Sequence, residues 1–273
     1  MRNFWKGAGR VAALLLGAKV IAEIVKSCNK RNTSPEPKKN RELTNAKKTV
    51  DRTDSKYISN QLVVWKRSGV SDKAFTEWKS KNLEKFVNIA RTKSCDSCDS
   101  SLELWEGDDV PNVISEQVAS GGTTTPTHIR GGGDDVACYT YNLIIDLPEP
   151  HLCEPYQREI KLPDQSNAAD PAVIVAVFDT GISSLIKNTY TFPVPSCQLG
   201  GKLGWNFAYG SDNTEDDHPH MHGSTVAKFI IDQADKYKKN KINILPVKVH
   251  NNDGKSDLFS VLCGFAYAAR LWR

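Results

Sequence analysis

The chain has 273 residues, of which 39% are hydrophobic and 25% are charged. This length excludes a peptide hormone or a small disulfide knot, and the composition excludes wholesale disorder and a polytopic membrane protein. The net charge of +4 is uneven, because residues 1–60 hold 14 Lys and Arg against 5 Asp and Glu, which leaves 22 against 27 in residues 61–273. The body of the chain is therefore acidic, and nucleic acid is not expected as a partner.

The N-terminus has the order of an export signal. Basic residues at positions 2, 6 and 10 precede an apolar stretch over 11–25 that is interrupted by Lys19 and Glu23. This order is typical of a secretory signal, although the stretch is shorter than the roughly 20 residues of a membrane span and an amphipathic or solvated helix also fits. We expect membrane association through residues 4–26, and favour a secreted or membrane-associated location over a cytoplasmic one.

Composition divides the chain into five parts. Residues 29–56 are polar, basic and contain two prolines, which is typical of a disordered linker. Glycine, threonine and proline dominate 121–133, which predicts a loop. The parts are a basic and apolar leader (1–28), the basic linker (29–56), a small α+β domain (57–115), a loop-rich connector (116–160) and a larger α/β domain (161–273).

The small domain is predicted from three segments. A short strand is expected over 61–66, an amphipathic helix or two over 72–91, and an alternating strand over 101–106. A further strand pattern appears over 136–147, inside the connector. Strand, helix and strand in this order make a small α+β module that by itself predicts no chemistry.

Cys95 and Cys98 have the spacing of a metal or redox site. A structural zinc site needs a second cysteine pair, which Cys138 and Cys153 do not supply. A zinc site, a disulfide and ordinary thiols therefore remain open for these two cysteines. The seven cysteines of the chain are too few to replace a packed core.

The chemistry is concentrated in the larger domain. The apolar run 172–178 reads as a strand buried on both faces and ends at Asp179, where open α/β sheets place their catalytic groups. A short strand is expected over 204–207. His222 then stands at the start of a helix, where the macrodipole disfavours the imidazolium. A strand over 244–249 leads to a final helix capped by Ser256 or Asp257.

Three segments in this order resemble the subtilisin-like serine proteases, the subtilases. They are VIVAVFDTGI (173–182), HGSTVA (222–227) and ILPVKVHNNDGKSDLFSVLCGFAYAA (244–269). The resemblance implies an incomplete three-layer subtilisin-like parallel sheet, and it identifies the small α+β domain before it as propeptide-like. It also implies a serine-type endopeptidase acting on peptide or protein substrates. We expect no cofactor and no metal among the site residues.

The resemblance assigns roles to two residues. His222 would take the proton from the nucleophile, while Asp179 would orient and stabilise the imidazole, in the Asp, His, Ser order of subtilisin. His218 and His220 depart from the family pattern, which has small or polar residues there. Asp216 and Asp217 match its acidic stretch and are expected to shape the loop.

The family's nucleophile segment, of the type Gly-Thr-Ser-Met-Ala, is missing, as is its oxyanion Asn. Only 51 residues follow His222, and neither Ser224, inside the His segment, nor Ser256, a helix cap, fits the nucleophile. We expect the chain alone to be inactive. A truncated gene product, or half of a split protease with a C-terminal half supplying the Ser, would explain this, and an unpaired edge beside strand 244–249 is expected.

Three alternatives remain open. FDTGISS (178–184) also resembles the aspartic proteases, whose mechanism needs a second carboxylate. His218, His220 and His222 alternate next to two aspartates, as the ligands of a metal hydrolase do. The third alternative is a non-catalytic pseudoprotease fragment that acts as a binding or inhibitory module.

Overall fold

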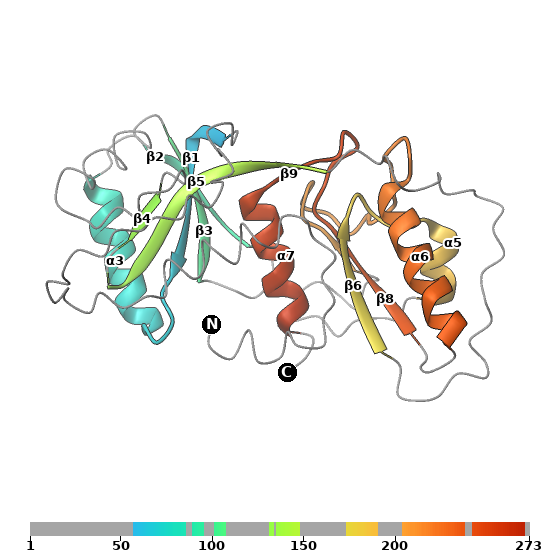
Figure 1. Cartoon of the computed structure of the whole chain (residues 1–273). Helices are drawn as coiled ribbons and strands as arrows, with labels where there is room; N and C mark the ends of the chain where they lie inside the picture. The colour runs from blue at the N-terminus through green and yellow to red at the C-terminus, as the bar shows by residue number, and fades with distance from the viewer. Residues whose placement is uncertain are drawn as a thin grey trace, which may run out of the picture.

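The computed structural model describes residues 57–85, 89–95, 101–107, 131–133, 135–147, 173–190, 204–237 and 242–270 (Figure 1). The predicted leader (1–28), including the membrane-associating residues 4–26, lies outside these ranges, as does the predicted linker (29–56). Within the described ranges, no helix has both the length and the hydropathy to span a membrane. These ranges contain four helices and two sheets, so the chain has a mixed α/β fold.

The first sheet is antiparallel and is built around β1 (Tyr57–Lys66). Its strand order is β2-β3-β1-β5-β4, with β9 pairing the far end of β5. The other bounds are β2 (Ile89–Ser94), β3 (Leu102–Gly107), β4 (Gly131–Gly133), β5 (Ala137–Asp146) and β9 (Lys255–Asp257).

Both faces of β1 are covered, which explains its uninterrupted apolar run. Leu62 and Val64 pack with Phe75 of α3 (Asp72–Lys85), whereas Val63 and Trp65 point into a second core on the opposite face. Because successive side chains of a strand point to opposite faces, a strand covered on both sides needs apolar residues throughout. The same reason accounts for the buried residues along β5, which lies in the range predicted as a connector.

The predicted helix over 72–91 is too long. α3 ends at Lys85 and the chain pairs again as β2 from Ile89, where Arg91–Ser94 lie opposite Glu106–Glu103 of β3. Hydrogen bonding along β3 overrides the helical spacing that continues past residue 85, since tertiary pairing outweighs local propensity.

The second sheet is parallel, with strand order β6-β8-β7. Its strands are β6 (Val173–Asp179), β7 (Trp205–Asn206) and β8 (Ile242–Lys248). Val177 and Ile244 pack with α5 (Ser184–Tyr190) and α6 (His222–Tyr237) on one face, while Phe178 and Val247 pack with a further helix on the other. Within the described ranges β6 pairs only with β8, so β6 forms an edge of this sheet.

Helix α7 (Leu258–Arg270) lies between the two sheets (Figure 1). It contacts β3 and β5 on one side and β6 and β8 on the other. Leu258 and Val261 share one core cluster with Val63 of the antiparallel sheet and Val247 of the parallel sheet. The small unit and the parallel sheet are therefore packed on the same helix.

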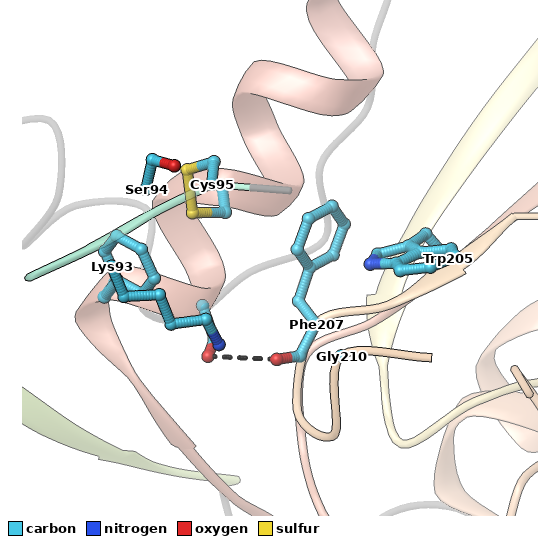
Figure 2. Close-up of a pocket in the computed structure, with 9 residues that line it drawn as sticks. Lys93, Ser94, Cys95, Trp205, Phe207 and Gly210 are labelled. Carbon is cyan, nitrogen blue, oxygen red and sulfur yellow. Dashed lines mark hydrogen bonds between the residues drawn. A yellow bond between two sulfur atoms is a disulfide. The ribbon is translucent and has the colours of Figure 1, made fainter. Parts of the chain in front are cut away.

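A disulfide joins Cys95, which directly follows β2, to Cys263 in α7, with 5.6 Å between the Cα atoms. This pairing removes two of the interpretations left open for Cys95, a zinc ligand and a bond to Cys98. Cys138 is also disulfide-bonded, while Cys98 lies outside the described residues. A close C-x-x-C spacing does not determine pairing, because the fold brings Cys263, 168 residues along the chain, to bonding distance of Cys95 (Figure 2).

The first turn of α7 is capped from two places. Asp257 accepts the Ser260 N–H at 3.0 Å through Oδ1, which confirms it as the predicted cap, whereas the Ser256 hydroxyl donates to the Val249 carbonyl at 2.5 Å. Asn142 of β5 accepts the Phe259 N–H at 3.0 Å and donates to Asp257 at 3.1 Å. The small unit thus satisfies an N–H that α7 cannot satisfy internally.

Replacing Asn142 with Ala should lower the free energy of unfolding by about 1–3 kcal/mol, because the Phe259 N–H then stays buried without a partner. Urea unfolding followed by fluorescence measures this change. Asn252→Ala, at an exposed position, is the matched control and should cost less than about 0.5 kcal/mol. Equal stability of the two variants would contradict the assigned cap.

Candidate active site

The carboxyl end of β6 and the first residue of α6 bring two predicted site residues together. Asp179 is the last residue of β6 and His222 is the first of α6. Asp179 Oδ1 lies 2.7 Å from His222 Nδ1, and the Asp179 residue is only 4% exposed. Two residues 43 positions apart therefore form a buried carboxylate–imidazole pair.

This pair is positioned by the way α6 begins. The Thr180 hydroxyl accepts the Gly223 N–H at 3.1 Å and donates to Asp216 at 2.8 Å. Asp216 in turn accepts the Ser224 N–H at 2.8 Å. The free N–H groups of the first turn are thus bound by residues at the end of β6 and in the loop before the helix, which fixes His222 against Asp179.

Glycine is required at position 223. A Cβ there would lie 2.2 Å from the Gly181 carbonyl oxygen and 2.9 Å from the Asp179 Cβ. A Cβ at Gly181, whose φ is 118°, would lie 2.4 Å from the Glu215 carbonyl oxygen. The backbone of β6 at its end is therefore in direct contact with the first turn of α6 and with the loop around Glu215. A side chain at either glycine would push these segments apart.

Ser224 does not have the environment of a nucleophile. It is fully buried, its hydroxyl donates to Asp216 Oδ2 at 2.7 Å, and its Oγ accepts the Ser183 N–H at 2.9 Å. A nucleophilic hydroxyl needs a hydrogen bond to a base and access to substrate. Ser224 instead belongs to the network that holds the first turn of α6.

Asp179 raises the pKa of His222. Its hydrogen bond to the imidazole is the largest cause, the negative charges of Asp179 and Asp216 act in the same direction, and burial opposes them. The start of a helix alone would act in the opposite direction, because a helix N-terminus disfavours the imidazolium. A carboxylate within hydrogen-bonding distance outweighs the partial charge of a helix end.

The second ring nitrogen of His222 is available. Within the described residues Nε2 makes no hydrogen bond, and the side chain is 15% exposed. An imidazole with one nitrogen bound to a carboxylate and the other open can accept a proton from a group that approaches Nε2.

The two aspartates before His218 shape the loop, as predicted. Asp216 binds the start of α6, and Asp217 Oδ1 lies 2.5 Å from the Lys248 Nζ. Lys248 is 1% exposed and also donates to the Glu215 carbonyl at 2.8 Å. A buried ammonium needs both a counter-charge and hydrogen-bond acceptors, and the loop at Glu215 and Asp217 supplies them. Lys248 therefore holds this loop against the end of β8.

The histidines of the loop do not form a metal site with His222. The rings of His218 and His222 are 6.4 Å apart between centroids, and His218 Nδ1 accepts the His220 N–H at 3.3 Å. Burial lowers the pKa of His218. Across the part of the chain that the structure describes, no three His, Cys, Asp or Glu side chains are grouped to bind a metal ion. Among the described residues, the metal-hydrolase alternative therefore has no set of ligands for a metal ion.

The aspartic-protease alternative also lacks its second group in these ranges. Asp179 is hydrogen-bonded to His222 and to the Thr180 N–H, at 2.8 Å for the latter, and to no carboxyl group among the described residues. A shared proton between two carboxyl groups is the basis of that mechanism.

His250 is a site neighbour that the sequence did not identify. It follows β8 by two residues, its N–H donates to the Asp179 carbonyl at 3.2 Å, and its side chain is almost fully buried. Nδ1 makes no hydrogen bond within the described ranges, and burial lowers the pKa of His250 to about 4. His250 is therefore neutral near pH 7 and adds no charge beside His222. Only the pairing of β8 with β6 could have indicated that His250 lies beside Asp179.

No known family model matches the chain, and no curated protein matches its sequence significantly.

Gly223→Ala should separate His222 from Asp179, because the added methyl group collides with the Gly181 carbonyl. We expect a loss of about 1–3 kcal/mol in stability, typical of an overpacked contact, together with loss of the low-field Nδ1–H proton signal in NMR. Lys228→Ala, which removes only an ion pair with Asp232 one turn along α6, should cost less than about 0.5 kcal/mol and leave the proton signal in place. An unshifted proton signal in the Gly223 variant would contradict the close contact.

Asp179→Asn should bring the pKa of His222 down toward its ordinary value of 6.5. NMR titration of the imidazole carbons measures it, and Asp232→Asn, farther along α6, is the control. Since the folded-state pKa is raised, the pair stabilises the wild type fully below pH 6.5, and this stabilisation is lost as the pH rises through the folded-state pKa. The Asn variant should lack that part of the pH dependence. A wild-type pKa at or below 6.5 would contradict the assignment.

Proposed function

We propose that this chain carries the acid–base part of a serine-type endopeptidase of the subtilase family. The observation that carries the proposal is the 2.7 Å contact between Asp179 Oδ1 and His222 Nδ1 with Nε2 open. In this mechanism a serine hydroxyl gives its proton to Nε2 while its oxygen attacks the peptide carbonyl. Asp179 holds the Nδ1–H and stabilises the imidazolium, and His222 then returns the proton to the leaving amine.

The arrangement of helices and sheet supports the proposal of a subtilisin-like fold. Helices cover both faces of a parallel sheet, and Asp179 lies at the carboxyl end of one of its strands. We assign this part as an incomplete three-layer subtilisin-like sheet, in agreement with the three segments quoted from the sequence. The α+β unit built on β1, packed against α7, is assigned as propeptide-like.

The nucleophile and its oxyanion donor are expected to come from outside these 273 residues. Ser224 is bound into the helix start, and the Ser256 hydroxyl donates to the Val249 carbonyl at 2.5 Å. Neither hydroxyl is hydrogen-bonded to His222. We therefore expect no peptide hydrolysis by the chain alone, and a C-terminal partner half would have to supply the serine.

A second candidate function is a non-catalytic binding or inhibitory module. The observation that favours it is the contact of the antiparallel sheet with α7 through β3 and β5, because a sheet that packs on a helix of this chain can pack on a similar helix of another protein. Titration of the chain against an active subtilase distinguishes the two: an inhibitory module lowers that activity in proportion to its concentration, and an acid–base half does not.

The test of the catalytic proposal is reconstitution. The chain is co-expressed with a polypeptide encoded downstream of Arg273 that carries a Gly-Thr-Ser-Met-Ala type segment, and peptide hydrolysis is measured with and without a serine-directed reagent. We expect no hydrolysis by either part alone, and reagent-sensitive hydrolysis by the pair. The rate should rise with pH through the raised pKa of His222, because only the neutral imidazole accepts the proton.

Asp179→Asn should lower the reconstituted rate by about 10⁴-fold, the order of loss known when subtilisin loses its triad Asp. Asp232→Asn is the matched control and should retain the wild-type rate. Hydrolysis that survives both His222→Ala and the serine-directed reagent would refute the proposal, as would the absence of any downstream segment able to restore activity.

A further inference from the structure

The residue before His222 has a backbone conformation that bulky side chains rarely adopt. Met221 has a φ of 47°, and it is the only residue other than glycine with a positive φ in the part of the chain that the structure describes. This left-handed region is unfavourable because the Cβ comes too close to the following carbonyl oxygen. Residues held there gather at functional sites, where surrounding contacts outweigh the strain. The contacts of Met221 must therefore compensate for its conformation.

Hydrogen bonds hold the Met221 backbone from both sides. Its N–H donates to the His218 carbonyl at 2.8 Å, which closes a turn with Pro219 at the second position, where proline is favoured. Its carbonyl accepts the Thr225 N–H at 2.9 Å and the Thr225 hydroxyl at 3.0 Å. The first bond ends the loop and the other two begin α6, so the chain changes direction at Met221.

Met221 occupies the N-cap position of α6 without acting as a cap. An N-cap residue usually lies in the β region and accepts an N–H of the first turn through a side-chain oxygen. Here Thr180 accepts the Gly223 N–H and Asp216 accepts the Ser224 N–H. The Met221 side chain, which is partly buried, packs instead on the core between the parallel sheet, α5 and α6. Position 221 therefore serves the direction of the chain and not the capping of the helix.

We propose that Met221 is a positioning residue for His222, because its left-handed backbone lets the chain from Asp216 to Ser224 close on itself. One carboxylate joins the two arms of this reversal: Asp216 Oδ1 accepts the His218 N–H at 3.3 Å, and Asp216 Oδ2 accepts the Ser224 N–H at 2.8 Å. With a negative φ at position 221 the chain leaves the turn in another direction, and these two bonds are not kept together. The first turn of α6, which begins with His222, is then released from the loop.

Release of this turn has a measurable effect on the imidazole. The hydrogen bond of His222 to Asp179 and the negative charge of Asp216 both raise the pKa of His222. A first turn that is free of the loop moves away from Asp216 and holds its contact with Asp179 less firmly, so the pKa of His222 should fall. The importance of Met221 for catalysis rests on the proposed function, whereas its importance for the orientation of the imidazole does not.

Two substitutions in the full chain separate the backbone of Met221 from its side chain. Asn adopts the left-handed region readily but does not replace the apolar packing, whereas Val is apolar but resists that region because it is branched at Cβ. The pKa of His222 and its Nδ1–H proton signal are measured by NMR, with urea unfolding as the measure of overall stability. We expect Met221→Asn to keep the signal and a pKa above 6.5, and Met221→Val to lose the signal and shift the pKa down toward 6.5.

The opposite pattern, with the signal lost in the Asn variant and kept in the Val variant, would overturn the proposal, because packing would then orient His222. Retention of the signal by both variants would overturn it as well. If both lose it, or if the Val variant fails to fold, Met221→Gly and Met221→Ala decide, since both lack the apolar side chain and only glycine adopts a positive φ without strain.

The Gly variant should then keep the signal and unfold at a higher urea concentration than the Ala variant, and equal behaviour of the two would refute the positioning role. Since every readout is made without catalysis, failure of the protease proposal would leave this result unaffected.

Discussion

The first turn of α6 rests directly on the end of β6, and the candidate site depends on this contact. Gly223 allows the helix backbone to reach the Gly181 carbonyl, and Thr180 and Asp216 bind the N–H groups that the helix exposes. His222 meets Asp179 as a consequence of that packing. The orientation of the imidazole is thus determined by backbone geometry, which is a firmer constraint than a side-chain contact between two mobile elements.

The ionisable groups around Asp179 and His222 are either compensated by a partner or held neutral by burial. Lys248 is neutralised by Asp217, His250 is kept neutral, and Asp216 is enclosed by four hydrogen bonds with Thr180, Ser224 and the His218 N–H. Carboxylates therefore dominate the field at His222, which agrees with its raised pKa. A base in such a field is stronger than a free imidazole and needs a correspondingly higher pH to be unprotonated.

The sequence predicted those structural features that are determined by residues close together along the chain. The apolar run before Asp179 and the helix start at His222 are local features, and both lie where they were expected. The end of α3, the partner of Cys95 and the burial of Lys248 and His250 depend on strands and helices brought together from distant positions. Local spacing carries no information about those contacts, because the free energy that selects them comes from tertiary packing.

The position of α7 has a consequence for folding. One helix contributes side chains to a core shared by both sheets, and its first turn is completed by Asn142 from β5. Neither sheet can bury its apolar face on α7 unless the helix has formed, and the helix start is completed only by the small unit. The two sheets should therefore lose their structure in one cooperative transition.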